Sequence, residues 1–214
     1  MRYQSSILVS FILLGAELSG CQQNASGPEY RISAAQAQWR GYQVGEQLRF
    51  GHAKDGKVRT YRITELKDYM DTQWQQSGWL PVPKGEPPTY QHLEARAERT
   101  DSAAGEFMAF EAFMYTPRGG DTLELRAECH WERSQTFYLP LDAANQGSVS
   151  SANVTLLPNV TLGSISYGPT LRLSAAAASV SRPDYKVIRQ VYLAKGKGVV
   201  AFEEDGTGLW YRLP

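Results

Sequence analysis

The chain has 214 residues, of which 42% are hydrophobic and 11% are aromatic, so it can bury a core of ordinary size. Lysine plus arginine and aspartate plus glutamate each number 22, which gives a formal net charge of zero. This balance speaks against a nucleic-acid-binding protein, because duplex binding needs a clustered cationic surface. It also supplies no polybasic surface that would hold the protein on anionic lipids.

The amino terminus has the pattern of a secretory leader. Arg2 lies beside the free amine, and an apolar run covers residues 7–16 until Glu17 ends it. The run is too short to span a bilayer, which needs about 20 apolar residues, and its length suits a signal peptide. We therefore expect residues 1–20 to be a signal peptide.

Residues 18–21 (Leu-Ser-Gly-Cys) resemble the bacterial lipobox, in which an aliphatic residue and two small residues precede a cysteine. The resemblance implies that the thiol of Cys21 accepts a diacylglycerol group and that Cys21 becomes the first residue after cleavage. Two or more acyl chains give stable anchoring, at ~0.8 kcal/mol per buried CH₂. The alternative is an ordinary signal peptide that happens to end beside a cysteine.

Residues 21–28 are small and polar, as in a flexible tether. In proteobacterial lipoproteins an aspartate after the cysteine tends to retain the protein at the inner membrane. Here Gln22 follows Cys21, so the resemblance favours the outer membrane. We expect the partner at this end to be a lipid membrane of the bacterial cell envelope, reached through acylated Cys21.

Period-two alternation dominates the rest of the chain and predicts strands. In residues 122–133, small or apolar residues at 123, 125, 127, 129 and 131 alternate with charged residues and His130. Residues 93–98 show the same alternation. Successive side chains of a strand point to opposite faces, so these segments predict a sheet with one buried and one wet face. Residues 107–115 are apolar at almost every position, which predicts a central strand covered on both faces.

Turn signals connect these segments. Asp55-Gly56 predicts a hairpin between residues 47–50 and 58–63. Residues 185–195, 199–203 and 209–213 predict a three-stranded meander at the carboxyl end, in which Lys195-Gly196-Lys197-Gly198 forms a tight turn rather than a phosphate-binding loop. We expect residues 135–141 to add one more strand and residues 142–151 to be a loop.

Helical signals are few. Residues 33–40 favour a short helix, with Ser33 available as its N-cap, and residues 174–179 contain four consecutive alanines. We therefore expect residues 29–214 to form one mainly β domain, built either as a single antiparallel curved sheet or as a partly closed β-barrel, with a short N-terminal helix.

Two segments carry a family resemblance. Residues 44–50 with 61–64, and residues 191–202 with 208–210, resemble segments of uncharacterised bacterial envelope lipoproteins, especially those of Bacteroidota. The likeness covers the leader, roughly 42–64 and roughly 185–213, whereas the uncharged segment 143–171 has no counterpart that we can place. The resemblance implies an antiparallel β domain in the envelope and assigns no catalytic residue.

Histidines and carboxylates suggest one enzymatic alternative. His92 with Glu94, and His130 with Glu132, each place an imidazole and a carboxylate on one face of a predicted strand. If these strands were adjacent, the four side chains could gather around a zinc ion, as in a metal-dependent enzyme or an envelope hydrolase. The competing interpretation is a solvated sheet face, where charged residues need no special role.

Aromatic residues suggest a binding function instead. They gather around the proline-rich segment 78–90 and the predicted central strands, and the candidates for ligand contact are Trp74, Trp79, Tyr90, Phe113 and Tyr115, with Phe107 nearby. Such rings can hold an apolar or peptide ligand, although filling the core is the commoner role of an aromatic residue.

Recognised catalytic and cofactor-binding motifs are absent from the sequence, and Cys129 and His130, as neighbours on a strand, point to opposite faces. We therefore expect a non-enzymatic envelope lipoprotein without a cofactor, which binds a hydrophobic ligand, a peptide or a partner protein. The alternatives are the metal-dependent enzyme or hydrolase described above and a purely structural component of an assembly.

Overall fold

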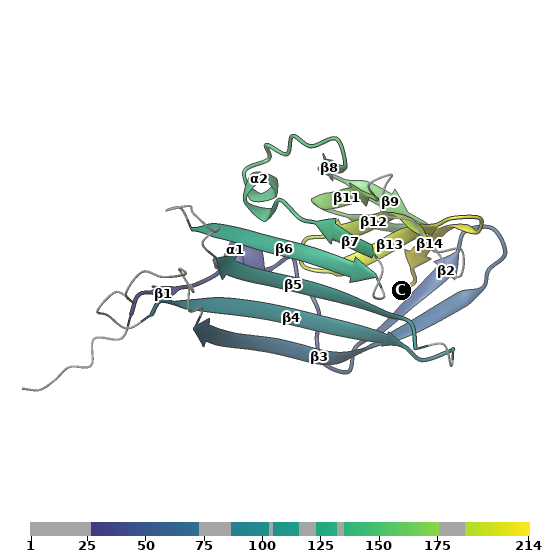
Figure 1. Cartoon of the computed structure of the whole chain (residues 1–214). Coiled ribbons are helices and arrows are strands. Elements are labelled where there is room, and N and C mark those ends of the chain that lie inside the picture. Colours follow the sequence, from purple (N-terminus) through teal and green to yellow (C-terminus); the bar gives the residue numbers. More distant parts are fainter. Residues whose placement is uncertain (1–26, 73–86, 103–104, 116–122, 132–134, 176–186) are drawn as a thin grey trace, which may run out of the picture.

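The computed structural model describes residues 27–72, 87–102, 105–115, 123–131, 135–175 and 187–214 (Figure 1). The strands and helices of these parts of the chain are β1 (Glu29–Tyr30), α1 (Ala34–Ala37), β2 (Gln47–His52), β3 (Val58–Thr72), β4 (Thr89–Arg99), β5 (Phe107–Tyr115), β6 (Glu124–Trp131), β7 (Gln135–Tyr138), α2 (Leu141–Asn145), β8 (Val154–Leu157), β9 (Val160–Leu162), β10 (Ile165–Tyr167), β11 (Thr170–Ser174), β12 (Ile188–Ala194), β13 (Gly198–Glu204) and β14 (Gly208–Arg212).

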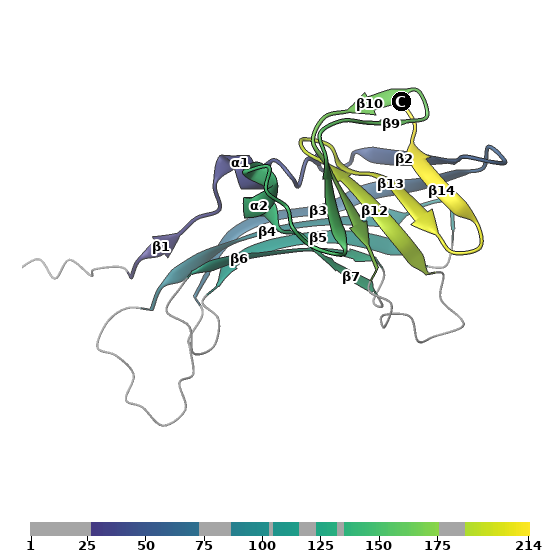
Figure 2. The same cartoon turned by 90° about the horizontal axis from the view of Figure 1, so that it is seen from above.

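One large sheet contains nearly all of these strands. Its order is β7-β6-β5-β4-β3-β2-β14-β13-β12-β11-β8, and β1 joins it beside β4. Neighbouring strands run antiparallel, except for the short parallel pairing of β1 with β4. The sheet curls strongly, so that β11–β14 lie across the long strands β3–β6 (Figures 1 and 2). The prediction of a mainly β fold with a curved, partly closed antiparallel sheet is confirmed.

The alternating patterns of the sequence correspond to the two faces of this sheet. On β4, Leu93, Ala95 and Ala97 are buried, whereas Glu94, Arg96 and Glu98 lie on the other face. We call the buried side the inner face and the opposite side the outer face. The hairpin at Asp55-Gly56 and the carboxyl-terminal meander β12–β14 also form as predicted.

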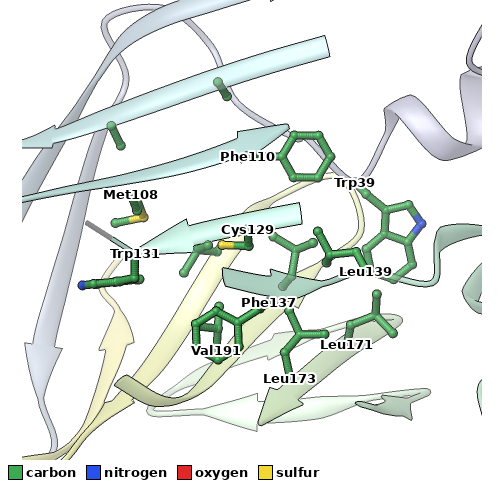
Figure 3. Close-up of a cluster of buried hydrophobic side chains, with 14 of the residues drawn as sticks. Trp39, Met108, Phe110, Cys129, Trp131, Phe137, Leu139, Leu171, Leu173 and Val191 are labelled. Carbon is green, nitrogen blue, oxygen red and sulfur yellow. The ribbon is translucent and has the colours of Figure 1, made fainter. Parts of the chain in front are cut away.

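The core lies between the two halves of the curled sheet. Met108, Cys129 and Trp131 from β5 and β6 face Val191 and Leu173 from β12 and β11 (Figure 3). Burial raises the pKa of the Cys129 thiol to about 12, so this residue is a small apolar core side chain. Trp39, which follows α1 and is 0% exposed, packs at one end of the same core.

The curled sheet is held closed by a side chain from its edge strand β7. Gln135 donates a hydrogen bond to the carbonyl oxygen of Ile188 on β12 (2.8 Å) and accepts one from the Ile188 N–H (2.7 Å). Both residues are buried, and a side chain thus replaces strand pairing at this point. Between these two strands the half-barrel is thus fastened by a side chain rather than by strand pairing.

The strand covered on both faces is β13, and the prediction that residues 107–115 would be covered twice is wrong. The hairpin β9–β10 lies over β12–β14 (Figure 2). It packs on their outer face, where Leu162 and Tyr167 cover Val200 and Ala201. On β5 only the inner positions, such as Phe110, are fully buried, and Phe107 and Phe113 are half-buried.

The two short helices lie side by side over one end of the half-barrel (Figure 2). Ser33 caps α1, as the sequence predicted, although the helix ends at Ala37. The cap is a reciprocal capping box with Gln36. The prediction that residues 142–151 would be a loop is wrong in part, because α2 covers Leu141–Asn145. Leu141 and Ala144 form its buried side, which explains why a helix forms in a segment with weak local signals.

Candidate binding site

A pocket of about 410 Å³ lies between the two edges of the curled sheet. It is bounded by the end of β5, the start of β6, the connection from β7 to α2, and the start of β8. We call it the seam pocket, and its lining residues are Tyr115, Leu125, Arg126, Ala127, Tyr138, Leu139, Pro140, Ser151 and Val154. The pocket therefore occupies the place where further strand pairing would have closed a barrel.

The edge of β6 that borders this pocket lacks a strand partner at its start. The strand β7 pairs with β6 only from Glu128 to Trp131, and no other described strand pairs with that edge. The Leu139 N–H donates to the carbonyl oxygen of Ala127 (2.9 Å) before Pro140 directs the chain towards α2. Beyond Ala127, the β6 edge is open to the pocket within the part of the chain that the structure describes.

The hydrogen bond to Ala127 shows which backbone groups face the pocket. Ala127 directs its carbonyl away from β5, and this direction alternates along an antiparallel strand. Leu125 therefore also directs its N–H and C=O away from β5, towards the seam pocket. Backbone groups in this arrangement are a template for one more strand.

The pocket lining is mainly aliphatic and aromatic, with one charged side chain, Arg126. The Nε of Arg126 donates to Glu128, and this ion pair raises the pKa of the guanidinium. Its Nη2 lies 3.5 Å from the hydroxyl of Tyr138, and its Cζ lies 5.3 Å from the centre of the Tyr138 ring. The guanidinium is thus held at the rim of the pocket.

The aromatic residues that the sequence suggested as ligand contacts lie in different environments. Tyr115 lines the seam pocket, and its hydroxyl donates to Glu124 (3.1 Å). Tyr90 is 2% exposed and stacks on Tyr30, with ring centres 5.4 Å apart. Phe113 lies on the outer face next to Tyr115. Trp74 and Trp79 are outside the described residues, as is Cys21.

Stacked rings cross the outer face of the long strands. These rings are Tyr69 on β3, His92 on β4 and Phe113 on β5. The ring centres of Tyr69 and His92 are 5.1 Å apart, and those of His92 and Phe113 are 5.3 Å apart. Because the rings cover one another's faces, the central ring of His92 offers no flat surface to a ligand. The row extends to Arg126, whose Cζ lies 6.0 Å from the ring centre of Phe113.

Three carboxylates lie beside this aromatic row. Glu94, Glu111 and Glu128 are directly opposite one another on β4, β5 and β6, an arrangement that is unfavourable for like charges. The Tyr69 hydroxyl donates to Glu94 (2.6 Å), which raises the pKa of the phenol to about 12. Compensation of this kind is needed for the three charges to share one face.

His130 lies close to the other two carboxylates, Glu111 and Glu128. Its Nε2 lies 3.3 Å from an oxygen of Glu128 and 3.6 Å from an oxygen of Glu111. Interaction with Glu111 raises the pKa of His130, and His130 in turn lowers the pKa of Glu111. The partly buried imidazole thus lies between two acids.

The proposed metal-binding quartet does not come together. His92 is opposite Phe113 and Arg126, whereas His130 is opposite Ala109, which is four residues away along β5. That spacing separates the two imidazoles by roughly 13 Å along the strands, too far to share one ion. No group of three or more suitable ligands occurs among the described residues, which do not include Glu132.

Sequence reasoning missed most of the seam pocket. Its walls come from four separate segments, and Leu139, Pro140, Ser151 and Val154 carry no distinctive motif. The available signal was the alternation that places Arg126 and Tyr138 on the wet face of their strands. In the structure Tyr138 is 60% exposed.

No family model, no curated protein and no solved structure matches the chain. Neither of the two described helices is long and apolar enough to cross a membrane.

Proposed function

We propose that this chain is a non-enzymatic binding module of the bacterial cell envelope, which takes up an extended peptide segment in the seam pocket. The peptide adds as a strand to the open edge of β6. The lipid anchor at Cys21 holds the module on the envelope membrane, with the outer membrane favoured by Gln22.

The open edge of β6 is the observation that carries this proposal. An exposed strand edge presents backbone donors and acceptors in a fixed order, and unprotected edges promote association with other chains. Proteins usually protect such edges with strand pairing or a covering segment, whereas here the edge at Leu125 borders a pocket. A peptide gains affinity from backbone hydrogen bonds and specificity from the side chains that enter the pocket.

The chemistry of the lining agrees with a peptide ligand. Leu125, Leu139 and Val154 can contact aliphatic side chains, and the tyrosine hydroxyls with Arg126 supply polar contacts at the rim. A mainly apolar lining with a few polar groups is the usual composition of a small binding site.

Peptide selection tests the proposal. A phage-displayed library of random nonapeptides is selected against the acylated full-length lipoprotein in lipid nanodiscs, and affinities of enriched peptides are measured by calorimetry. The variant Tyr138→Ala should weaken binding about tenfold or more, because it removes one wall of the pocket. Tyr69→Ala is the matched control, since Tyr69 is also an exposed tyrosine of the outer face but does not line the pocket.

Backbone methylation of the peptide then tests strand addition itself. An added strand bonds to β6 through every second residue, so N-methyl groups on one alternate set of amides should abolish binding and those on the other set should not. Equal effects of the two sets, or a library without any enriched peptide, would contradict the proposal.

The anchor has its own test. The Cys21→Ala variant, produced in a bacterial host, should leave the membrane fraction, and the mature wild-type protein should show the added mass of acyl chains in mass spectrometry. A Cys21→Ala protein that still fractionates with membranes, or a mature chain without acyl mass, would refute the anchor and leave the peptide site to be judged separately.

A further inference from the structure

Strand addition to β6 determines which side chains of a peptide meet which parts of the pocket. The peptide residue opposite Arg126 projects its side chain on the same face as Arg126, the outer face. The adjacent peptide residue lies opposite Leu125 and projects towards the inner face, whereas the place opposite Ala127 is already taken by Leu139. The pocket thus contacts two consecutive peptide residues, one on each face.

The inner side of the pocket is aliphatic. Leu125 packs against the hydrophobic core, Leu139 is 4% exposed, and Val154 is partly buried beside them. A polar side chain directed here would lose its hydration without a partner, which is costly. The peptide residue opposite Leu125, which faces inward, should therefore be apolar.

The outer side of the pocket presents a guanidinium that retains unused donors. The Nε of Arg126 is occupied by Glu128 and its Nη2 contacts the Tyr138 hydroxyl, whereas its Nη1 has no partner among the described residues. The Arg126 side chain is 42% exposed, so a ligand can reach it. Stacking on Tyr138 keeps it in place, which lowers the cost of binding.

The charges of the lining point to the sign of the ligand. Arg126 is the charged residue among the nine residues of the seam pocket, and the other polar contacts come from the hydroxyls of Tyr115, Tyr138 and Ser151. A carboxylate beside Arg126 would receive charge-assisted hydrogen bonds, which are stronger than neutral ones.

We infer that the seam pocket selects extended peptides with an adjacent apolar–acidic pair, in which the apolar residue lies opposite Leu125 and the aspartate or glutamate lies opposite Arg126. This inference rests on the proposed peptide-binding function and adds the class of peptide.

Three synthetic nonapeptides test the inference. They are identical except for a central glutamate, glutamine or lysine, which is flanked by valines within a threonine-rich sequence. Against the acylated full-length lipoprotein in nanodiscs, the glutamate peptide should bind about tenfold or more tighter than the glutamine peptide, and the lysine peptide should bind most weakly.

Two arginine variants locate the effect. Arg126→Gln should remove the preference for glutamate over glutamine, whereas Arg96→Gln should leave it unchanged. Arg96 is a close control, because its side chain is 41% exposed, lies on the same outer face and is paired with Glu98, but it does not line the pocket.

The outcomes separate this inference from the proposal on which it rests. Equal affinities of the glutamate and glutamine peptides, with the methylation pattern still alternating, would overturn the apolar–acidic pair and leave peptide binding intact. Failure of every peptide, including library peptides, would overturn both. Dodecanoate carries a carboxylate and an aliphatic chain but no amides, so tight dodecanoate binding that displaces the peptide would make the ligand a lipid and also overturn the inference.

Discussion

The two halves of the curled sheet differ in how their outer faces are covered. The half formed by β12–β14 is buried on both faces, by the core on the inside and by the hairpin β9–β10 on the outside. The half formed by β3–β7 packs only its inner face, and its outer face carries stacked rings, paired charges and two exposed tyrosines, Tyr69 and Tyr138.

This difference separates stability from binding. A strand covered twice cannot present its side chains to a ligand, and no residue of β12–β14 lines the seam pocket, which is bordered instead by the start of β8. The half with an open outer face ends in the unpaired start of β6, so its rings and charges lie beside usable backbone groups. We therefore assign the stability of the molecule mainly to β12–β14 and its recognition surface to β5–β7.

The largest expected effect is the loss of a ring from the doubly covered half. Phe202 on β13 is 0% exposed and lies 4.4 Å from Trp131 and 5.2 Å from Phe50, measured between ring centres. Phe202→Ala should lower the free energy of unfolding by about 4 kcal/mol, because it leaves a cavity. Phe113→Ala on the open face should cost about 1 kcal/mol or less. Urea denaturation measures both, and equal losses would erase the comparison.

A buried ion pair at the end of the inner face gives the next effect. Arg59 and Glu204 are 6% and 1% exposed in their side chains, and they form two hydrogen bonds of 3.1 and 2.6 Å. Glu204→Gln should cost about 3 kcal/mol, because it leaves a buried guanidinium without its counter-charge. Glu98→Gln, which breaks the exposed pair with Arg96, should cost less than about 1 kcal/mol in the same denaturation assay.

The hydrogen bonds between β7 and β12 should contribute an intermediate amount to the free energy of unfolding. Gln135→Ala removes both hydrogen bonds to Ile188, so that the buried N–H and C=O of Ile188 lose these partners. We expect the free energy of unfolding to fall by about 2 kcal/mol. Thr136→Ala, on the exposed side of the same strand, should change stability by no more than about 0.5 kcal/mol. If the two variants behaved alike, β7 would not hold the half-barrel closed.

The smallest effect concerns the acidic row and depends on pH. The folded-state pKa of His130 is raised above 6.5, so its contribution is complete below that value and is lost as pH rises through the raised pKa. The folded-state pKa of Glu111 is lowered below 4.5, so its contribution is complete above that value and is lost as pH falls through the lowered pKa. Both contributions are therefore present between about pH 4.5 and 6.5.

Glu111→Gln should accordingly destabilise the protein more at pH 5.5 than at pH 9. The cost should stay below about 1 kcal/mol, because the Glu111 side chain is 45% exposed and solvent weakens the pair. Thermal melts at the two pH values measure the difference. A cost that is the same at both would mean that His130 and Glu111 do not titrate together.

The fold was predictable where local signals and burial agree. The alternation in residues 93–98 and 123–131 marks the two faces correctly, and Asp55-Gly56 marks a hairpin. The covering of a strand was not predictable from its own composition. Residues 107–115 and 199–202 are both apolar runs, but only the second is covered twice, because the distant hairpin β9–β10 returns to it.

The candidate site was less predictable, for a related reason. Tyr115 was singled out by its aromatic character, and it lines the pocket. The pocket itself exists because β7 is short and Pro140 turns the chain away from β6. Leu125 therefore has no described strand residue beside it on that edge, although the alternation in its own sequence predicts an ordinary paired strand. A missing pairing between strands that are far apart in sequence leaves no local pattern.

Amide hydrogen exchange at Leu125 tests the central claim most directly. In the free protein this N–H should exchange quickly, because it points into the seam pocket, whereas the Phe110 amide in the middle of β5 should exchange slowly. Saturation with a selected peptide should slow exchange at Leu125 by tenfold or more, as roughly expected for a backbone amide that gains a hydrogen bond. Slow exchange at Leu125 in the free protein, or no change when the peptide binds, would contradict strand addition at this edge.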